Sequence, residues 1–371
     1  MGVKIVLVGA GGYGRRYLES LLEIDENHAQ LIGVVDPDIQ QIGFKEVLHM
    51  REVSVFESSE ACYRSNKQID LVIIASPIHT HYHYVVEALE HGCDVLCEKP
   101  VTLEKELFDD LVLREKRTGR FVAVGFQQCF SPALQDLKAD ILNGIFGRPI
   151  ACKSLFLTRR EDHYYHRNSW AGKIQAGGQN IFDSPLSNGC SHQLQTMLFL
   201  LGPSMPSSAR IKLVEGKTYQ GRPTIENFDG LAIRVTTQEG CEILFSASHA
   251  IKSKKVGPMN ELRFELATIT SDGPDWKAVF TDGRVHIYRK DSEHPMQKLH
   301  AVITHIQEQT KPVCTLETVR SHLEVVLATQ TLERTFYTDC VRCEEDGDGY
   351  WAIEHLEPNL LDAYETWRLP L

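Results

Sequence analysis

Residues 1–14, MGVKIVLVGAGGYG, decide how the first part of the chain folds. Residues 4–8 form a nearly continuous apolar run, which is typical of a strand buried in a parallel sheet. A glycine-rich turn follows, and the apolar spacing over residues 17–22 then predicts a helix with one buried face. A strand, a glycine turn and a helix in this order indicate a unit that binds a dinucleotide.

The turn matches the pattern GxGxxG, and each of its glycines has a separate task. Gly9 permits a tight turn, Gly11 lets the backbone approach a pyrophosphate, and Gly14 lets the helix pack closely on the strand. Gly12 and Tyr13 complete the loop. The N-terminus of the following helix offers N–H groups and a positive dipole end to phosphate. Without the flanking strand and helix, the same glycines would indicate only a turn.

Asp36 supports this interpretation, because it ends the next apolar strand, residues 31–35. A carboxylate at that place accepts hydrogen bonds from the adenosine ribose hydroxyls. Asp38 follows closely and no basic residue does, so a 2′-phosphate would be repelled. The pattern therefore predicts NAD rather than NADP. The alternative role for Asp36 is that of a turn residue before Pro37.

A chain of 371 residues exceeds one ordinary domain, and the spacing of its apolar residues changes along the sequence. Two domains are therefore predicted. The first, residues 1–126, alternates short strands and helices and is expected to be a Rossmann domain with a mostly parallel sheet. The second, residues 127–371, has longer strands of alternating pattern and is expected to be an α+β domain with a large, mostly antiparallel sheet. Strands are predicted near residues 53–56, 71–75, 94–97, 121–124, 150–157, 210–214, 231–236, 242–248, 261–268, 278–280 and 285–288, and helices near 42–50, 58–64, 82–90, 103–117, 132–142, 299–307, 316–332 and 358–367.

Composition excludes several classes of function. The chain has 39 basic and 50 acidic residues, a net charge of −11, which argues against nucleic acid or an anionic membrane as the main partner. The ten cysteines lack the spacing of a zinc site or a secreted disulfide framework. His79, His81 and His83 lack a carboxylate or thiolate at helical spacing, so we expect no metal. The apolar opening is too short for a signal peptide, which predicts a cytoplasmic protein.

Two further segments carry a resemblance. Residues 75–100 read ASPIHTHYHYVVEALEHGCDVLCEKP, and residues 177–202 read GGQNIFDSPLSNGCSHQLQTMLFLLG. With the glycine motif, they resemble the family of glucose–fructose oxidoreductase, inositol dehydrogenase and MocA. The most specific element is Glu98-Lys99-Pro100, which follows a predicted strand. The resemblance implies an NAD-linked oxidoreductase whose further cofactor contacts are Ser76, Pro77, His81, Glu98, Lys99 and Gln127.

Lys99 is the first candidate catalytic residue. It lies at the carboxyl end of a predicted parallel strand, where ligands bind in such sheets. An ammonium group there can hydrogen-bond a substrate oxygen and stabilise the charge that develops on it. Glu98 beside it would orient the lysine or contact the cofactor. The alternative is a solvated loop lysine.

His192 is the second candidate, on a helix that Pro185 is expected to open with Asp183 or Ser184 as its cap. The buried stripe of this helix is predicted at Leu194, Met197, Leu198 and Leu201. Asn188 lies four residues before His192, so their side chains are expected to share a face. The resembled family uses a helix histidine as its acid and base. The alternative is a structural histidine.

The resembled family commonly has aspartate where this chain has Asn188. An amide can position a hydroxyl group but carries no charge to bias a histidine. Asp183 is expected to substitute for it or to cap the helix. The polar and aromatic loop after residue 158 adds Arg160 and Trp170 as candidate substrate contacts, with a plain surface loop as the alternative.

These observations predict an NAD-dependent dehydrogenase that acts on a CH–OH group of a sugar, polyol or related compound. One alternative is an NAD-binding sensor that has lost turnover, which Asn188 favours and Lys99 with His192 opposes. Another is an enzyme with tightly held NAD that performs internal redox or elimination. The resembled family commonly pairs through its sheet, so a homodimer or homotetramer through the C-terminal sheet is expected.

Overall fold

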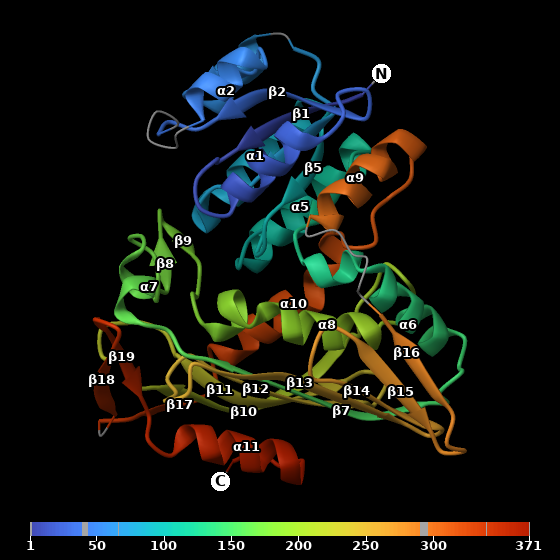
Figure 1. The fold of residues 1–371 in the computed structure, drawn as a ribbon, viewed down its shortest axis with the longest axis vertical. Coiled ribbons are helices and arrows are strands. Elements are labelled where there is room, and N and C mark those ends of the chain that lie inside the picture. Colours follow the sequence, from blue (N-terminus) through green and yellow to red (C-terminus); the bar gives the residue numbers. More distant parts are fainter. Residues whose placement is uncertain (1, 39–43, 66, 290–295, 339, 371) are drawn as a thin grey trace. The chain divides into compact units, whose positions relative to one another are not determined.

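The structure, a computed structural model, describes residues 2–38, 44–65, 67–289, 296–338 and 340–370 (Figure 1). The chain forms two compact units, each made of two stretches of sequence. The first is Met1–Phe130 with His294–Glu317, and the second is Ser131–Glu293 with Thr318–Leu371. The domain boundary expected after residue 126 stays a prediction. What the sequence pattern did not anticipate is that a late segment packs within the first unit.

The first unit is built on a six-stranded parallel sheet in the order β3-β2-β1-β4-β5-β6. This order reverses its direction of growth between β1 and β4, which is the arrangement of dinucleotide-binding sheets. The predicted Rossmann fold is confirmed. Its strands are β1 Val3–Val8, β2 Ala29–Val35, β3 Ser54–Phe56, β4 Leu71–Ile74, β5 Asp94–Cys97 and β6 Val122–Val124, and its helices before the second unit are α1 Gly14–Glu23, α2 Lys45–Met50, α3 Ser59–Arg64, α4 His81–Glu90 and α5 Lys105–Thr118.

The late segment of the first unit carries α9 (Gln297–Glu308), which contacts β1 and β5. After α9 the chain runs beside β6, where the Val124 N–H donates to the Cys314 carbonyl at 2.9 Å. The Gln307 amide also donates to the His28 carbonyl at 3.0 Å. These hydrogen bonds make the segment an integral part of the unit that begins at the N-terminus.

The second unit is built on a nine-stranded sheet in the order β16-β15-β14-β13-β7-β12-β11-β10-β17. Most neighbours are antiparallel, while β7 with β12 and β10 with β17 are parallel, so the sheet is mixed. The strands are β7 Pro149–Thr158, β10 Ile211–Gln220, β11 Gly230–Thr237, β12 Glu242–Ser248, β13 Lys255–Phe264, β14 Ala267–Ser271, β15 Trp276–Phe280, β16 Val285–Tyr288 and β17 Glu333–Phe336.

Helices cover both faces of this sheet (Figure 1). α6 (Pro132–Leu142) and α8 (Ser191–Leu200) lie on one face, and α11 (Leu356–Thr366) lies on the other. The core under α11 joins Leu155 and Leu157 of β7 to Leu356 and Leu360 of the helix. Leu194, Met197 and Leu198 of the stripe predicted for α8 are buried, whereas Leu201 is only partly buried. Burial also extends beyond one stripe, to Gln195, Thr196, Phe199 and Leu200, because the helix is enclosed on nearly all sides.

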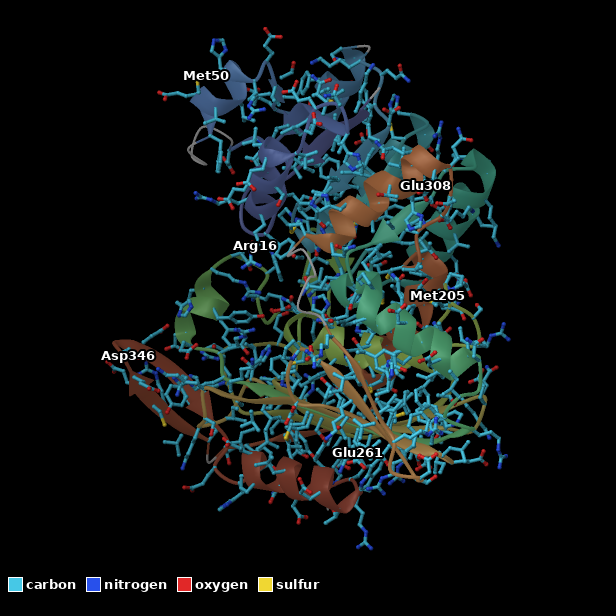
Figure 2. All side chains as sticks on the ribbon, turned by 45° about the vertical axis from the view of Figure 1, so that its right-hand side comes forward. Arg16, Met50, Met205, Glu261, Glu308 and Asp346 are labelled. Carbon is cyan, nitrogen blue, oxygen red and sulfur yellow. The ribbon has the colours of Figure 1, made fainter. Side chains whose placement is uncertain are left out.

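Three details of the second unit differ from the sequence pattern. The strand predicted at 261–268 is two strands, since the chain turns between β13 and β14. Strand β17 was not predicted, because its four residues pair with β10 from more than 100 positions away. A hairpin that was not predicted, made of β18 (Val341–Glu345) and β19 (Asp348–Ala352), contains the acidic run 344–348 with Asp346 in its turn (Figure 2). The remaining elements are α7 Asp162–His166, β8 Gln175–Ala176, β9 Gln179–Asn180, the π-helical turn Pro185–Gly189 and α10 Leu316–Thr329.

Candidate functional site

The glycine loop leaves β1 in the geometry that its sequence predicts. Gly9 has φ +83°, and a Cβ there would come within 2.7 Å of the Ser76 backbone nitrogen, so glycine is required. Gly14 is equally confined, because its Cβ would lie 1.9 Å from the Gly9 carbonyl oxygen. The loop therefore packs tightly against its own strand and against the end of β4.

The outer side of the same loop is open. A Cβ at Gly11 or Gly12 would meet no heavy atom within 4 Å among the residues described, and both glycines are exposed. α1 begins directly after the loop, with its first N–H groups directed to this end of the helix. Tight packing behind and free space in front form a cradle that fits a pyrophosphate.

Asp36 fastens the loop to the end of β2. Its carboxylate accepts a hydrogen bond from the Ala10 N–H at 2.7 Å through one oxygen and from the Asp38 N–H at 2.9 Å through the other. Asp36 thus lies beside the glycine loop, as expected for a ribose-binding carboxylate. Its geometry fits NAD, although part of its hydrogen-bonding capacity already serves the loop.

The segment after β4 is held by His81 at the start of α4. The ring lies between two carbonyl oxygens, with Nδ1 2.8 Å from that of Pro100 and Nε2 2.8 Å from that of Ser76. Burial lowers the pKa of His81, although the two carbonyls act in the opposite direction. His81 therefore ties Ser76 and Pro77 to the Glu98-Lys99-Pro100 segment. Among the residues described, no group of three metal-ligating side chains is present.

Glu98 follows β5 and is the centre of a buried polar cluster. One of its carboxylate oxygens accepts hydrogen bonds from the Tyr17 hydroxyl at 2.8 Å and from the Lys298 ammonium group. The other oxygen faces the Lys99 N–H at 3.4 Å. Burial raises the pKa of Glu98, but Lys298 and Tyr17 outweigh burial and hold it below its ordinary value. Glu98 is thus an anchored carboxylate, and its contact with the cofactor stays a prediction.

Lys298 of α9 was not predicted as a site residue. Its side chain is 2% exposed, and its ammonium group lies 4.5 Å from the centre of the Tyr13 ring and 5.1 Å from that of Tyr17. Tyr13 in turn donates a hydrogen bond to the Gln127 side chain at 3.3 Å. Lys298 therefore connects the glycine loop, Glu98 and Gln127 inside the first unit.

Lys99 lies at the carboxyl edge of the sheet, which is also the edge from which the glycine loop leaves β1. It is half-buried and precedes Pro100, with a cis peptide bond between them. Lys99, Glu98, His81 and Ser76 are thus brought together within the first unit by the ends of β4 and β5.

In the second unit, the structure brings Asp183 and Asn188 together. The Asn188 amide donates to one oxygen of Asp183 at 2.9 Å, and the Gly172 N–H donates to the other at 2.7 Å. Asp183 is 3% exposed. The cap of this helical segment is Ser184, whose side chain accepts from the Ser187 N–H in a reciprocal capping box. Asp183 is consequently a partner of Asn188 and not the cap.

His192 is the second residue of α8. It lies three positions after the end of the π-helical turn Pro185–Gly189, which carries Asn188. The predicted single helix is therefore divided in two, and the simple four-residue spacing of one α-helix does not apply to Asn188 and His192. His192 is half-buried, and its carbonyl accepts a hydrogen bond from the Thr196 hydroxyl at 2.8 Å.

The loop after β7 places Arg160 close to Asn188. The guanidinium group of Arg160 lies 4.6 Å from the centre of the Tyr164 ring, and the Tyr164 hydroxyl lies 3.4 Å from the Asn188 amide. Trp170 is partly exposed and lies 5.2 Å from the Arg167 guanidinium group. Arg160 thus belongs to the Asp183–Asn188 cluster, and Trp170 lies at its border.

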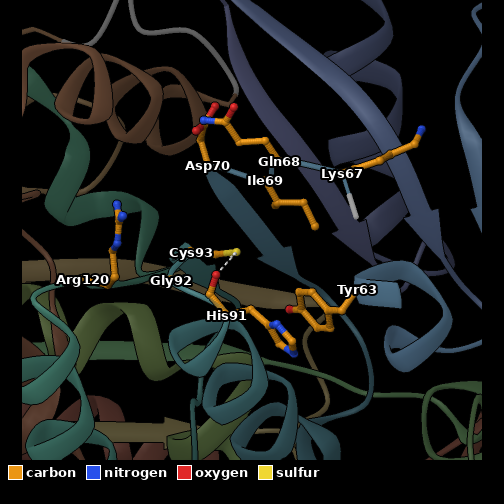
Figure 3. Close-up of a pocket in the computed structure, with 9 residues that line it drawn as sticks. All are labelled: Tyr63, Lys67, Gln68, Ile69, Asp70, His91, Gly92, Cys93 and Arg120. Carbon is orange, nitrogen blue, oxygen red and sulfur yellow. Dashed lines mark hydrogen bonds between the residues drawn. The ribbon is translucent and has the colours of Figure 1, made fainter. Parts of the chain in front are cut away.

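A separate cavity of about 470 Å³ lies in the first unit (Figure 3). It is lined by Asp70, Cys93 and Arg120, which precede β4, β5 and β6, and by the stacked rings of Tyr63 and His91. It therefore opens at the amino edge of the parallel sheet. Because ligands of such sheets bind at the carboxyl edge, this cavity is not the dinucleotide site.

Known proteins resemble this chain in sequence. Residues 3–126 match the model of the oxidoreductase family with an NAD-binding Rossmann fold. The chain is 28% identical over 246 residues to inositol 2-dehydrogenase 4 of Saccharopolyspora erythraea, covering 64% of the chain and 68% of the relative. It is 32% identical over 156 residues to scyllo-inositol 2-dehydrogenase (NAD(+)) of Bacillus subtilis, covering 41% and 43%.

Residues 3–126 belong to the Gfo/Idh/MocA oxidoreductase family. The chain is accordingly an NAD-binding oxidoreductase, as the glycine motif and Asp36 predict. The match to the Bacillus subtilis relative covers less than half of that relative's length.

Solved structures share the fold of this chain over 89% of its length. The WlbA dehydrogenase from Bordetella pertussis, solved with NADH and UDP-GlcNAcA, has a TM-score of 0.72 at 18% identity and covers 89% of this chain and 96% of its own. An NAD-binding oxidoreductase from Klebsiella pneumoniae has a TM-score of 0.72 at 20% identity, with coverage of 89% and 96%. At such identities the likeness concerns the fold alone.

Two residues that contact the candidate site residues have no signal in the sequence. Lys298 reaches Glu98 across 200 positions of sequence, and His249 reaches the Asn188 turn from the end of β12. No local motif surrounds either residue, so only the fold identifies them.

As for membranes, the described part of the chain contains no helix with the length and apolar character that a bilayer span requires.

Proposed function

We propose that this oxidoreductase oxidises a CH–OH group of a sugar, a polyol or a related hydroxy compound with NAD. The observation that carries the proposal is the position of Glu98-Lys99-Pro100. It follows β5 at the sheet edge from which the glycine loop leaves, and Glu98 is anchored there by Tyr17 and Lys298. A lysine held at this edge has the position of an electrophilic group beside a nicotinamide.

In the first unit, the residues divide into cofactor and substrate roles. The backbone of Gly11 and Gly12 with the α1 N-terminus would hold the pyrophosphate, and Asp36 the adenosine ribose. When bound, NAD accepts the hydride from the carbinol carbon. The Lys99 ammonium group donates a hydrogen bond to the substrate oxygen and stabilises its developing negative charge.

In the second unit, His192 takes the hydroxyl proton, because imidazole exchanges protons near neutral pH. Asn188 donates its amide to Asp183 and so presents a fixed side chain toward a substrate hydroxyl. Asp183 supplies the carboxylate that the resemblance would lead one to expect at position 188. Arg160 and Trp170 border the substrate.

The test measures NADH formation after NAD is mixed with inositols, sugars and sugar acids. Lys99→Ala and His192→Ala are each expected to lower kcat by about 10²–10⁴-fold, as removal of an acid–base or oxyanion-stabilising group does. Lys105→Ala, whose side chain pairs with exposed Asp109, and exposed His355→Ala are matched controls that keep full activity.

Turnover that survives in both Lys99→Ala and His192→Ala would refute the assigned roles. NAD binding with no turnover across the panel would instead favour a sensor, and NAD that copurifies with the protein without release of NADH would favour internal redox or elimination.

We further propose that the protein acts in the cytosol and pairs through the large sheet. Support for pairing comes from Val279, Val285 and Ile287, which are 39%, 52% and 43% exposed. Val279 and Val285 are partners across β15 and β16, so these side chains form an apolar patch on one face of the sheet.

A further inference from the structure

Arg160 and Arg167 share one aromatic ring in the second unit. Their guanidinium groups lie 4.6 Å and 3.6 Å from the centre of the Tyr164 ring. A stacked guanidinium group uses its flat face on the ring and keeps its N–H edge for a planar or tetrahedral anion. Two cations beside one ring repel each other, so the arrangement costs free energy unless negative charge is supplied.

The described residues of the second unit supply no such charge by direct pairing. Neither Arg160 nor Arg167 has a carboxylate within ion-pair distance among them, and the buried Nε of Arg160 has no hydrogen-bond acceptor. Their neighbours differ: Arg159 pairs with Glu161 and Glu345, and Arg222 pairs with Asp162.

His249 provides a second, independent observation. It is 3% exposed, its Nδ1 lies 3.4 Å from the Tyr165 hydroxyl, and its buried Nε2 has no hydrogen-bond partner among the residues described. Burial lowers the pKa of His249 well below its ordinary value, and Arg160 and Arg167 lower it further. A neutral histidine thus lies beside two arginines that have no carboxylate partner among the described residues, although Arg167 donates a hydrogen bond to the Tyr164 carbonyl.

The position of these groups links them to the Asn188 turn. A Cβ on Gly189 would lie 2.5 Å from Nε2 of His249 and 3.6 Å from a terminal nitrogen of Arg160. The residue directly after Asn188 therefore lies against both groups, and glycine is needed for that approach. Asp183 is the acidic group of this cluster, and its two oxygens accept hydrogen bonds from Gly172 and Asn188.

We propose that Arg160 and Arg167 bind an anionic group of the substrate, so that the compound oxidised is an acidic sugar or polyol. This inference rests on the proposed function, because it deepens the substrate class of the same site. A carboxylate and a phosphate both fit the N–H edges of two guanidinium groups. Buried His249 lies behind Arg160, with its Nε2 against Gly189.

The experiment is a calorimetric titration of the NAD-loaded protein with three probes: D-glucuronate, D-glucose 6-phosphate and D-glucose. At least one of the two anions is expected to bind about 10–100-fold more tightly than glucose, as charge-assisted hydrogen bonds predict. Arg160→Gln and Arg167→Gln should reduce this ratio toward one. Arg284→Gln, which removes an exposed arginine paired with Asp282, is the matched control and should leave it unchanged.

Each outcome decides the matter. Tighter binding of glucuronate than of glucose 6-phosphate identifies a carboxylate subsite, and the reverse identifies a phosphate subsite. Failure of both anions to outcompete glucose, or a preference that persists in Arg160→Gln and Arg167→Gln, overturns the inference. Turnover of neutral sugars alone would overturn it while the proposed dehydrogenase stands. Anion binding that depends on these arginines without any NADH formation would sustain the subsite and count against the dehydrogenase.

Discussion

At the scale of single residues, the glycine loop separates the demands of folding from those of binding. Gly14 faces the Gly9 carbonyl, whereas Gly11 faces open space and has no positive φ. Both positions belong to one motif, and the sequence alone assigns them different tasks without measuring the room around them. Their substitutions should therefore fail in different ways.

We predict that Gly14→Ala lowers the free energy of unfolding by about 1–3 kcal/mol, because the added methyl group collides with backbone. Gly11→Ala should unfold at the same temperature as the wild type and bind NAD at least about tenfold more weakly, since the methyl group fills the pyrophosphate's place. Thermal unfolding and fluorescence titration with NAD measure the two effects. Unchanged NAD affinity in Gly11→Ala would place the pyrophosphate elsewhere.

The Asp183–Asn188 pair permits a test by exchange. Asn188→Asp puts the aspartate where the resemblance implies it, but it removes the donor that Asp183 accepts from and sets two carboxylates together. We expect a loss of about 1–3 kcal/mol in stability and lower activity. The double variant Asp183→Asn with Asn188→Asp restores both hydrogen bonds and should recover stability. Equal stability of the single and double variants would contradict the pairing.

At the scale of elements, short-range signals in the sequence predict most strands and helices of the first unit. They do not predict the contacts between residues that lie far apart in the sequence. The strands and helices of the first unit follow from apolar spacing and turns, and Asp36 and Glu98-Lys99-Pro100 follow from their place after strands. α9 has an ordinary amphipathic pattern, and this pattern does not predict that Lys298 contacts Glu98. Likewise, β17 has no pattern of its own beyond its pairing with β10.

We predict that Lys298→Met, in α9, lowers the free energy of unfolding by an amount that depends on pH. In the wild type the pKa of Glu98 is lowered, so its ionisation stabilises the fold above the unfolded pKa of about 4.3 and ceases to do so as pH falls through the folded pKa. Without Lys298, burial raises that pKa, and ionisation then opposes folding at neutral pH. We expect a loss of about 3–5 kcal/mol near pH 7 and a clearly smaller loss near pH 4.

Urea unfolding of Lys298→Met at several pH values measures this difference. The double variant Lys298→Met with Glu98→Gln should recover part of the stability at pH 7, because no buried charge remains. A loss that is independent of pH would mean that Lys298 contributes by packing alone.

At the scale of the whole molecule, the sequence predicts a parallel sheet followed by a mostly antiparallel one. It does not predict that a late segment returns to the first unit. Alternating strands after residue 149 indicate a second, larger sheet. The apolar patch on β15 and β16 is visible only when the register is known, since Val279 faces Val285 across the pair.

If the protein pairs through this patch, the variant with both Val285→Asp and Ile287→Asp should be monomeric, because four charges would be desolvated in a pair of subunits. Light scattering at several concentrations measures the mass. His286→Asp adds a charge at an exposed position on the opposite face of β16, and so tests whether charge alone disturbs the sheet. A wild-type mass equal to one chain at all concentrations would rule the pairing out.

The late segment of the first unit also constrains the order of events during synthesis. A ribosome releases residues 1–130 long before residue 294, and about 160 residues of the other unit emerge between them. At bacterial or eukaryotic elongation rates this interval lasts roughly 10–30 s. Throughout it, Glu98 lacks Lys298 and β6 lacks the segment that carries Cys314. The dinucleotide-binding unit, first to be translated, is thus completed only after most of the second has been made, and a nascent chain halted near residue 130 should remain a client of chaperones.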